Sequence, residues 1–459
     1  MPETPDLASA ARSHSVGIVG GGFGGLIVAW ECVKVGMSVT LWDAGDIGGM
    51  TRLVSVDGAR VDVAADNIER SEAVDEVLSA FGLTDKLVAS ATHERWLLQR
   101  TPVVLPESPA LGIPASPFVS DVTSVIGWGA AWRAYLDRLK PVLTIGNAES
   151  LGELVSQRVG AKVRDKLVAP RTRAELGLDP ADVLIDAALP ELNSALTRAG
   201  SLSGGVGLLD VTPPSLSLAG GLGVLAEALR TRIEELGGTV HEHTPATSVE
   251  RAVDNWTITT TVHNAETDAD EPVETTVQHL VLATDGRTAH SLLVPLIPSL
   301  AADGSTEQTV VTLAVSGITA TRGAGVYASD AASDVQRIDH VTAQWPSIER
   351  ATGHEIVRVT LAERGADDDE AVQIAAGAVG EAYGATVTVI DSHVERFVRA
   401  QSRAARTHAD RVAAIRTQAA TMPHLDVVGA WVAGDTVRDV ITDAMATAEA
   451  IRRRALFSV

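Results

Sequence analysis

The sequence predicts a mixed α/β (α+β) protein in which a discontinuous Rossmann-like domain is interrupted by a helical and a mixed-sheet insertion. Three observations predict this architecture. A strand, a glycine-rich turn, a helix and a second strand follow one another within residues 15–42. Strand and helix patterns return at about 216–300 and again at the C-terminal end of the chain. Between them, the apolar residues of 122–196 recur mainly with helical spacing.

The expected elements follow in chain order. Up to residue 81 they are a disordered tail (1–14), a buried strand (15–19), a helix (26–37), a strand (38–42), a hairpin turning at Asp57-Gly58 (50–66) and a helix (71–81). From residue 200 to 300 they are a loop (200–215), a helix (222–236) and strands (239–249, 256–262 and 273–282), with an acidic hairpin tip at 264–272. Beyond residue 300 they are a strand-rich stretch (308–400) with one helix (370–382), an arginine-bearing helix (400–418), a strand (425–428) and a helix (439–454). We therefore expect three domains, which are a discontinuous dinucleotide-binding domain (15–95, 201–300 and 421–459), a helical domain (96–200) and a mixed-sheet domain (301–420).

Composition and charge narrow the class of protein. Of 459 residues, 45% are hydrophobic, so a sizeable core can form although aromatic residues make up only 3%. The formal net charge of −22 argues against nucleic acid as a partner, because its backbone is also anionic. The single cysteine, Cys32, excludes an internal disulfide and favours a reducing compartment. We recognise no signal peptide and no apolar run of membrane-spanning length, and expect a cytoplasmic protein.

The glycine-rich turn after the first strand has the spacing of a phosphate-binding loop. Gly20, Gly22 and Gly25 satisfy G-x-G-x-x-G, between an apolar strand and an apolar helix. The first glycine permits the tight turn, the second lets the backbone approach a pyrophosphate, and the third lets the helix pack close to the strand. The helix then offers free N–H groups and the positive end of its dipole to the phosphates.

An acidic residue and a second glycine pair extend this motif. Asp43 ends the second strand, where a carboxylate can accept hydrogen bonds from an adenosine ribose. The turn alone does not separate NAD from FAD. Gly48 and Gly49 follow closely and favour a cofactor that lies further across the domain, as FAD does. The chain has no second G-x-G-x-x-G motif, and so we expect no separate NAD(P)H domain.

Segments along most of the chain carry a resemblance, and they include VGIVGGGFGGLIVAWECVKVGMSVTLWDAGDIGGMTR, SLSLAGGLGVLAEALRTRIEELGGTV and LDVVGAWVAGDTVRDVITDAMATAEAI. In the same order, these segments resemble the protoporphyrinogen oxidase and coproporphyrinogen III oxidase family of FAD enzymes, whereas 300–420 matches only loosely. The resemblance implies FAD and the removal of six electrons from a porphyrinogen in heme biosynthesis, with oxygen as acceptor. Coproporphyrinogen III is the favoured substrate over protoporphyrinogen IX. The family also suggests peripheral membrane contact and a partner of the ferrochelatase type.

The resemblance assigns site residues position by position. The cofactor contacts fall on Gly20, Gly22, Phe23, Gly24, Gly25, Asp43, Ala44, Gly48, Gly49, Ala246, Gly429, Ala430 and Val437. The first of these bind the ADP half, the backbone at Ala246 faces the adenine, and Gly429, Ala430 and Val437 line the flavin and its ribityl chain. Arg70, Arg171 and Arg173 are the candidates for contacts to substrate carboxylates. Neither a catalytic side chain nor a metal ligand is assigned.

The chain departs from the family's pattern at four places. In the family an arginine precedes the second glycine pair, whereas this chain has Asp46-Ile47 there. Asp62-Val63-Ala64 stands in place of the family's Asp-x-Gly. Arg171-Thr172-Arg173 replaces a glycine-rich loop, and Asp443-Ala444 replaces Ser-Gly. Each change removes a phosphate contact or a close backbone approach, and Asp443 adds a negative charge near the cofactor. Two alternatives therefore stay open. The first is a related flavin amine oxidase or desaturase. The second is a divergent member whose FAD binding is weakened or lost, and which binds a porphyrin or protein partner without turnover.

Other patterns have a structural as well as a functional interpretation. His241 and His243 share one strand face, and an exposed strand pair is favoured over a metal site. Cys32 is expected to pack in the core of the first helix. Trp128 and Trp132 are four residues apart and form either a helix-core stripe or a stacking surface for a tetrapyrrole. The arginines at 396, 399, 403 and 406 form either a solvated helix face or a carboxylate-binding cluster.

Overall fold

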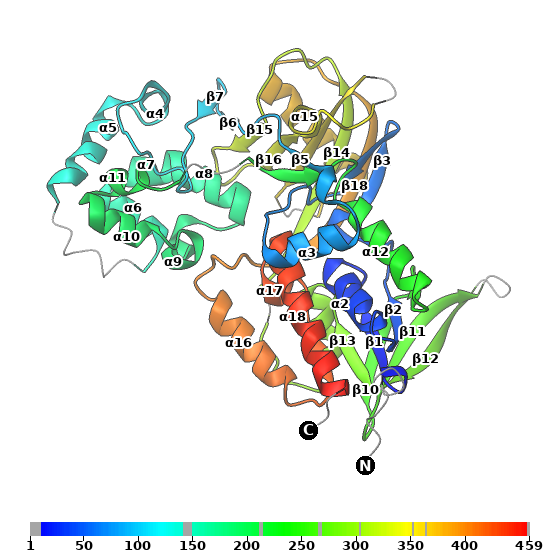
Figure 1. The fold of residues 1–459 in the computed structure, drawn as a ribbon. Helices are drawn as coiled ribbons and strands as arrows, with labels where there is room; N and C mark the ends of the chain where they lie inside the picture. The colour runs from blue at the N-terminus through cyan, green and yellow to red at the C-terminus, as the bar shows by residue number, and fades with distance from the viewer. Residues whose placement is uncertain are drawn as a thin grey trace.

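The structure is a computed structural model, and it describes residues 11–140, 149–210, 214–264, 269–302, 304–350, 353–362 and 365–456. Figure 1 shows a helical lobe at the left, joined to a larger body that contains the two largest sheets. The prediction of a mixed α/β fold is confirmed. No helix in these ranges is long and apolar enough to cross a membrane.

A five-stranded parallel sheet forms the lower part of the body. Its order is β19-β13-β1-β2-β9, with β1 Ser15–Val19, β2 Ser38–Trp42, β9 Thr239–His241, β13 His279–Leu282 and β19 Leu425–Val427. Every neighbouring pair is parallel. β1 is almost fully buried rather than alternating, because α2 (Phe23–Val33) packs on one face of the sheet and a small antiparallel sheet that includes Ile258 and Val277 packs on the other. The strands predicted at 15–19 and 38–42 are confirmed.

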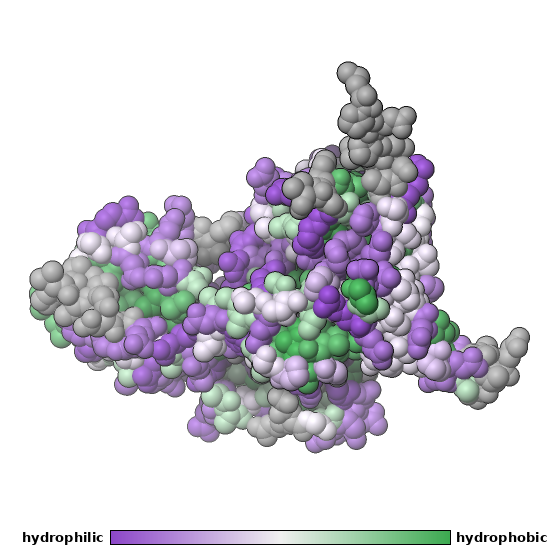
Figure 2. Space-filling model, turned by 90° about the horizontal axis from the view of Figure 1, so that it is seen from below, coloured by the Kyte–Doolittle hydropathy of each residue, from purple (hydrophilic) through white to green (hydrophobic). Residues whose placement is uncertain are grey.

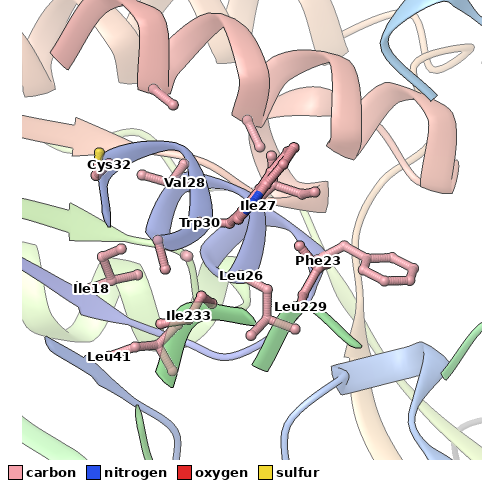
Figure 3. Close-up of a cluster of buried hydrophobic side chains, with 14 of the residues drawn as sticks. Ile18, Phe23, Leu26, Ile27, Val28, Trp30, Cys32, Leu41, Leu229 and Ile233 are labelled. Atoms are coloured by element: carbon pink, nitrogen blue, oxygen red, sulfur yellow. The ribbon is translucent and has the colours of Figure 1, made fainter. Parts of the chain in front are cut away.

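The helix α2 (Phe23–Val33) lies at the centre of the largest core cluster. Every residue of α2 is buried, because α12 (Gly223–Glu235) and α18 (Val437–Leu456) pack against it. Figure 3 shows its apolar side chains with those of the neighbouring strands and α12. Cys32 lies in this core, where burial raises the pKa of its thiol to about 12, so the packing interpretation is confirmed.

The boundaries of α2 differ from the predicted helix 26–37. The helix begins at Phe23 and ends at Val33, before a turn that includes Gly36 at a φ of 95°. Its glycine-rich first turn has low helix propensity, and close packing against the strand overrides that preference. The predicted disorder of 1–14 is wrong for the described residues 11–14, because Ala11 is fully buried in the same core. Residues 1–10 lie outside the described ranges.

A seven-stranded sheet forms the upper part of the body. Its order is β18-β14-β17-β16-β15-β6-β7, with β6 Arg95–Leu98, β7 Val103–Leu105, β14 Thr306–Ser316, β15 Gly325–Ala328, β16 Val335–His340, β17 Glu355–Leu361 and β18 Thr388–Arg399. All pairs are antiparallel except β6 with β15. The helix α15 (Asp368–Tyr383) packs against it, close to the predicted 370–382. Residues 95–105 thus join a sheet built mainly from 306–399.

The remaining strands form three small sheets. The hairpin of β3 (Leu53–Val56) and β4 (Ala59–Asp62) turns at Asp57-Gly58 as predicted. The others are β5 (Leu87–Ala89) with β8 (Leu216–Leu218), and β10 (Ala246–Arg251) with β11 (Trp256–Asn264) and β12 (Ala269–Val277). The predicted hairpin between β11 and β12 is confirmed, although its tip at 265–268 lies outside the described residues.

The helical lobe and its connections complete the fold. The helices of the lobe include α4 Ser120–Ile126, α5 Trp128–Tyr135, α6 Leu151–Arg158, α7 Ala161–Val163, α8 Ala169–Arg171, α9 Ile185–Ala188, α10 Leu192–Ala199 and α11 Leu202–Val206. Outside the lobe lie α3 Glu72–Ala80, α13 Gly286–Leu293, α14 Val341–Gln344, α16 His408–Ala419 and α17 Ala430–Ala433. Two π-helical segments, Arg164–Val168 and Thr172–Leu176, flank α8.

Two predictions about these segments are wrong. The helix α11 forms within the expected loop 200–215, because Ser201 caps it and its apolar residues enter the lobe's core. The arginine-bearing helix begins at His408 and not at residue 400. The preceding segment instead hydrogen-bonds the helical lobe, with Leu184 N–H donating to the Ala404 carbonyl at 2.7 Å and Arg406 N–H to that of Asp182 at 3.0 Å.

Candidate dinucleotide-binding site

The turn between β1 and α2 needs two of its glycines for packing. A Cβ at Gly20 would lie 2.5 Å from the carbonyl carbon and oxygen of Ala283, and the φ of Gly20 is +110°. A Cβ at Gly25 would lie 1.9 Å from the carbonyl oxygen of Gly20. Either side chain would therefore displace backbone, which accounts for the first and third glycines of the motif.

Gly22 has no such explanation within the protein. Its φ is −72°, which any residue adopts, and none of the described atoms lies within 4 Å of where its Cβ would be. Since neither backbone strain nor packing requires a glycine at this position, the reason that remains is the close approach of a ligand to the backbone. Within the described residues α2 has no side-chain cap and no acidic first turn, so its N–H groups face this space as an anion site.

Three segments that are separated in sequence meet at this turn, beside the carboxyl ends of the parallel strands. A Cβ at Gly24 would lie 3.2 Å from Cα of Gly429, and one at Gly49 would lie 3.4 Å from Cα of Gly22. Gly48 N–H donates to the carbonyl of Gly21 at 2.8 Å. The crevice at the carboxyl ends of parallel strands is where open α/β sheets bind nucleotides.

Asp43 braces the turn from the end of β2. Its carboxylate accepts from the N–H of Gly21 at 2.5 Å and from that of Gly45 at 2.8 Å. Burial raises the pKa of Asp43, and the two backbone hydrogen bonds oppose that shift. Two backbone donors leave acceptor capacity on the carboxylate, so it can also receive a ribose hydroxyl. Ala44, next in the chain, is exposed.

The loop at 46–49 is held without an arginine of its own. Ile47 N–H donates to Glu242 at 3.0 Å, and Arg52 is ion-paired with Glu395. Arg52 also lies 4.0 Å from Asp46 of this loop, so its guanidinium already faces two carboxylates and backbone N–H groups are left for a phosphate. Thr244 N–H donates to the carbonyl of Asp43 at 2.7 Å, which anchors the segment leading to the half-buried Ala246 on the expected adenine side.

The closing motif supplies the other side of the crevice. Gly429 is buried with a φ of 105°, Ala430 begins α17 and Val437 begins α18. The sequence suggested that Asp443 adds a negative charge near the cofactor. Its carboxylate is instead bound by Arg416 of α16, which balances that charge although burial raises the pKa of Asp443.

The three predicted substrate arginines lie in different surroundings. Arg70 is exposed and bound to Asp75 at 2.9 and 3.0 Å, and Arg173 is paired with Asp179. Only Arg171 is largely buried, at the end of α8. There it joins a group of charges between the helical lobe and the seven-stranded sheet.

This group of charges was not predicted as a unit. Its members are Arg171, Glu175, Tyr327, Arg337, Arg399 and Asp435. Arg399 was named in the arginine series, but Arg337 and Tyr327 carry no motif that could have identified them. The other arginines of that series bind separate acids, with Arg396 on Asp368, Arg403 on Asp439 and Arg406 on Glu149.

Two further interpretations can be judged from the structure. Trp128 and Trp132 are 64% and 57% exposed, so the helix-core stripe is wrong, and they lie against Phe118 and Tyr135 at the lobe's surface. His241 and His243 are both exposed as predicted, but only His241 belongs to β9, and His243, beyond the end of the strand, lies 3.0 Å from Asp46. Among the described residues, no three histidine, cysteine or acidic side chains are grouped to hold a metal ion.

Comparison with known proteins agrees with this geometry. A family described as an NAD(P)-binding Rossmann-like domain matches residues 18–81. The coproporphyrinogen III oxidase of Mycobacterium leprae is 27% identical over 466 residues, covering 96% of this chain and 98% of that protein. The mitochondrial protoporphyrinogen oxidase of Nicotiana tabacum is 26% identical and matches 55% of each chain. The chain is a relative of the porphyrinogen oxidases.

The fold of this porphyrinogen oxidase relative is also found in solved structures. A protein from Exiguobacterium sp. 255-15, provisionally named a protoporphyrinogen oxidase, superposes with a TM-score of 0.80 at 21% identity, covering 96% of this chain and 99% of that one. Putrescine oxidase superposes with a TM-score of 0.61 at 16% identity, covering 96% and 99%. The chain thus shares the fold of these two proteins.

Proposed function

We propose that this chain is an FAD-dependent oxidase that converts a porphyrinogen into a porphyrin, with coproporphyrinogen III as preferred substrate and oxygen as electron acceptor. The observation that carries the proposal is the similarity to coproporphyrinogen III oxidase along nearly the whole length of both chains. The crevice at Gly22 also supports the proposal, because a bound ligand would explain why this position is a glycine. Peripheral membrane contact, a ferrochelatase-type partner and cytoplasmic location stay predictions.

The residues of the crevice fit the ADP half of FAD. Gly22, Phe23 and Gly24 would present backbone N–H groups to the pyrophosphate, and Asp43 would accept from the ribose. Gly49 and Gly429 would let backbone approach the cofactor from the other two sides, and Ala246 would face the adenine. We propose Gly20, Gly25, Gly48, Ala44, Ala430 and Val437 as the remaining wall of the site.

The bound flavin would supply the electron-accepting ring that the side chains of this protein do not provide. The chain binds and orients the cofactor and holds the substrate beside it. The charge of the pyrophosphate would be met by the α2 dipole and backbone donors alone, because Arg52 is engaged with Glu395. We therefore expect weaker FAD binding than in relatives that place an arginine before the second glycine pair.

A spectrum and a turnover assay test this function. Purified protein, with and without added FAD, should show flavin absorbance after removal of free cofactor. Coproporphyrinogen III added under air should then yield porphyrin fluorescence and peroxide. A flavin-containing protein without porphyrin formation would favour a related amine oxidase or desaturase. A colourless protein that takes up no FAD would refute both enzyme functions and leave a non-catalytic binding protein.

A further inference from the structure

The junction between the helical lobe and the seven-stranded sheet contains a partly buried charge cluster, which we call the junction cluster. It consists of Arg171 and Glu175 from the lobe, Tyr327, Arg337 and Arg399 from the sheet, and Asp435 from the segment after α17. The cluster thus joins three parts of the molecule. Asp435 lies within 429–437, the stretch proposed to line the flavin, so the cluster borders the candidate active site.

Direct contacts hold the cluster together. Tyr327 Oη donates to Glu175 Oε1 at 3.1 Å, and Arg171 Nη1 lies 3.5 Å from the same oxygen. Arg399 Nη2 donates to the Glu175 carbonyl at 2.9 Å and lies 3.5 Å from Asp435. Glu175 is therefore the central anion of the cluster.

The cluster has more cationic than anionic groups. Asp339 pairs with both Arg95 and Arg337, and with this neighbouring pair included, four guanidinium groups (Arg95, Arg171, Arg337 and Arg399) face three carboxylates (Glu175, Asp339 and Asp435). Burial lowers the pKa of Arg399, and the charge of Arg337 lowers it further. Although the whole chain has a net charge of −22, the cluster itself has an excess of positive charge, and this local excess favours an anionic ligand.

Two guanidinium groups of the cluster also have unsatisfied donors. The Nε atoms of Arg171 and Arg337 are buried without a hydrogen-bond partner among the described residues. Arg337 Nε lies 3.1 Å from Asp339 Oδ2 without the alignment of a hydrogen bond, and Arg337 Nη1 reaches the Ala174 carbonyl only at 3.4 Å. A buried N–H donor without a hydrogen bond is unfavourable, so these two Nε atoms call for an acceptor.

The cluster can be reached from solvent. The side chains of Arg337 and Glu175 are 29% and 31% exposed. Figure 2 shows the surface hollowed between the helical lobe, at the left, and the rest of the molecule. The backbone around Glu175 is a π-helical segment, a rare conformation that occurs frequently at functional sites.

We propose that Arg171 and Arg337 bind a carboxylate of the substrate at the junction cluster, and that Glu175 is the resident anion which this carboxylate replaces. The proposal rests on the proposed function, and it identifies a site that determines specificity. Guanidinium groups bind carboxylates through paired, charge-assisted hydrogen bonds. Coproporphyrinogen III bears four propionates and protoporphyrinogen IX bears two. The proposed carboxylate is one of the two that only coproporphyrinogen III bears, so the site discriminates between the two substrates.

Kinetics of the FAD-loaded enzyme test the proposal. Arg337→Met keeps the volume of the side chain and removes its charge, so we expect KM for coproporphyrinogen III to rise roughly tenfold or more. The kcat value and the KM for protoporphyrinogen IX should change far less. Glu175→Gln should lower KM, because it removes the competing anion. The matched control is Arg164→Met, which removes an arginine of the lobe's other π-helical segment that is paired with Asp165.

Equilibrium binding separates this proposal from the proposed function. Coproporphyrin III binding, followed by its fluorescence without turnover, should weaken in Arg337→Met and be unchanged in Arg164→Met. If the parent protein oxidises no porphyrinogen but shows this pattern, the proposed function fails and the site stands. The proposed site is refuted if the variants Arg337→Met and Arg171→Lys bind coproporphyrin III as tightly as the parent protein does. Both variants must first show the flavin content and the Tm of the parent. Equal changes in KM for both substrates would also refute it.

Discussion

At the residue scale, the glycines of the phosphate turn divide into those that the fold needs and one that a ligand needs. Gly25 lies too close to the carbonyl of Gly20 for any side chain, whereas Gly22 has free space and an ordinary φ. Sequence analysis treats the motif as a unit, because the spacing alone does not separate these two roles. The structure separates them and makes each role testable on its own.

Substitutions at these two glycines should have opposite signatures. Gly25→Ala should destabilise the protein by about 3 kcal/mol or more, because the methyl group displaces backbone. Gly22→Ala should change the free energy of unfolding by less than about 1 kcal/mol and yet weaken FAD binding. Urea denaturation measures the first effect and FAD titration the second. If Gly22→Ala binds FAD as tightly as the parent, the assignment of the pyrophosphate site is wrong.

His279 should make stability depend on pH. The ring is 1% exposed, and burial, followed by the charges of His424 and His14, lowers its pKa to about 3. The unfolded chain, with a histidine pKa near 6.5, binds the proton more readily, so the free energy of unfolding falls as the pH falls below 6.5. Between pH 6.5 and 5 this histidine should account for a loss of about 2 kcal/mol.

A pH series of urea denaturations checks this expectation. His279→Gln should flatten the dependence between pH 5 and 6.5, whereas His243→Gln, at an exposed position, should leave the slope as in the parent. An unchanged slope in His279→Gln would show that other groups cause the acid sensitivity.

At the scale of elements, a buried carboxylate connects the hairpin β3–β4 to the helix α12. Asp62 accepts from the N–H groups of Leu222 and Gly223, both at 2.9 Å, at the start of that helix. The sequence marks Asp62 only as part of an altered family motif. Its actual contact is with a helix 160 residues further along the chain, which no local pattern reveals.

Removal of Asp62 should cost more than removal of an ordinary cap. Asp62→Ala leaves two buried donors unpaired and should lower the free energy of unfolding by about 2–4 kcal/mol. Asp285 accepts from Arg287 and Thr288 at the exposed start of α13, so Asp285→Ala should cost only about 1 kcal/mol. Chemical denaturation of both variants gives the comparison, and equal losses would contradict the role assigned to Asp62.

At the scale of the whole molecule, the crevice brings together segments from near the N-terminus and near the C-terminus. Gly24 and Gly429 are in backbone contact, although 405 positions separate them in the chain. A ligand in this crevice contacts both segments only when the chain is folded. Binding should therefore stabilise the entire fold.

FAD should raise Tm in proportion to its saturation of the site. At a free concentration 100 times the Kd, linkage predicts a gain of about 2.7 kcal/mol. Thermal unfolding followed across an FAD series gives the shift, with riboflavin as the comparison ligand, because it lacks the ADP half that the crevice is proposed to hold. A shift as large with riboflavin as with FAD would argue against binding through the ADP half.

The sequence by itself determined the features that arise from local patterns. The strands 15–19 and 38–42, the hairpin at Asp57-Gly58 and the glycine motif follow from apolar periodicity and turn residues, which act between neighbours in the chain. The tertiary structure alone decided which distant residues meet. Arg171 joins Arg337 and Arg399 at the lobe junction, Trp128 and Trp132 face outward, and 400–407 binds the lobe instead of forming a helix. The physical reason is that burial and charge pairing depend on contacts between distant segments, and local sequence carries no record of those contacts.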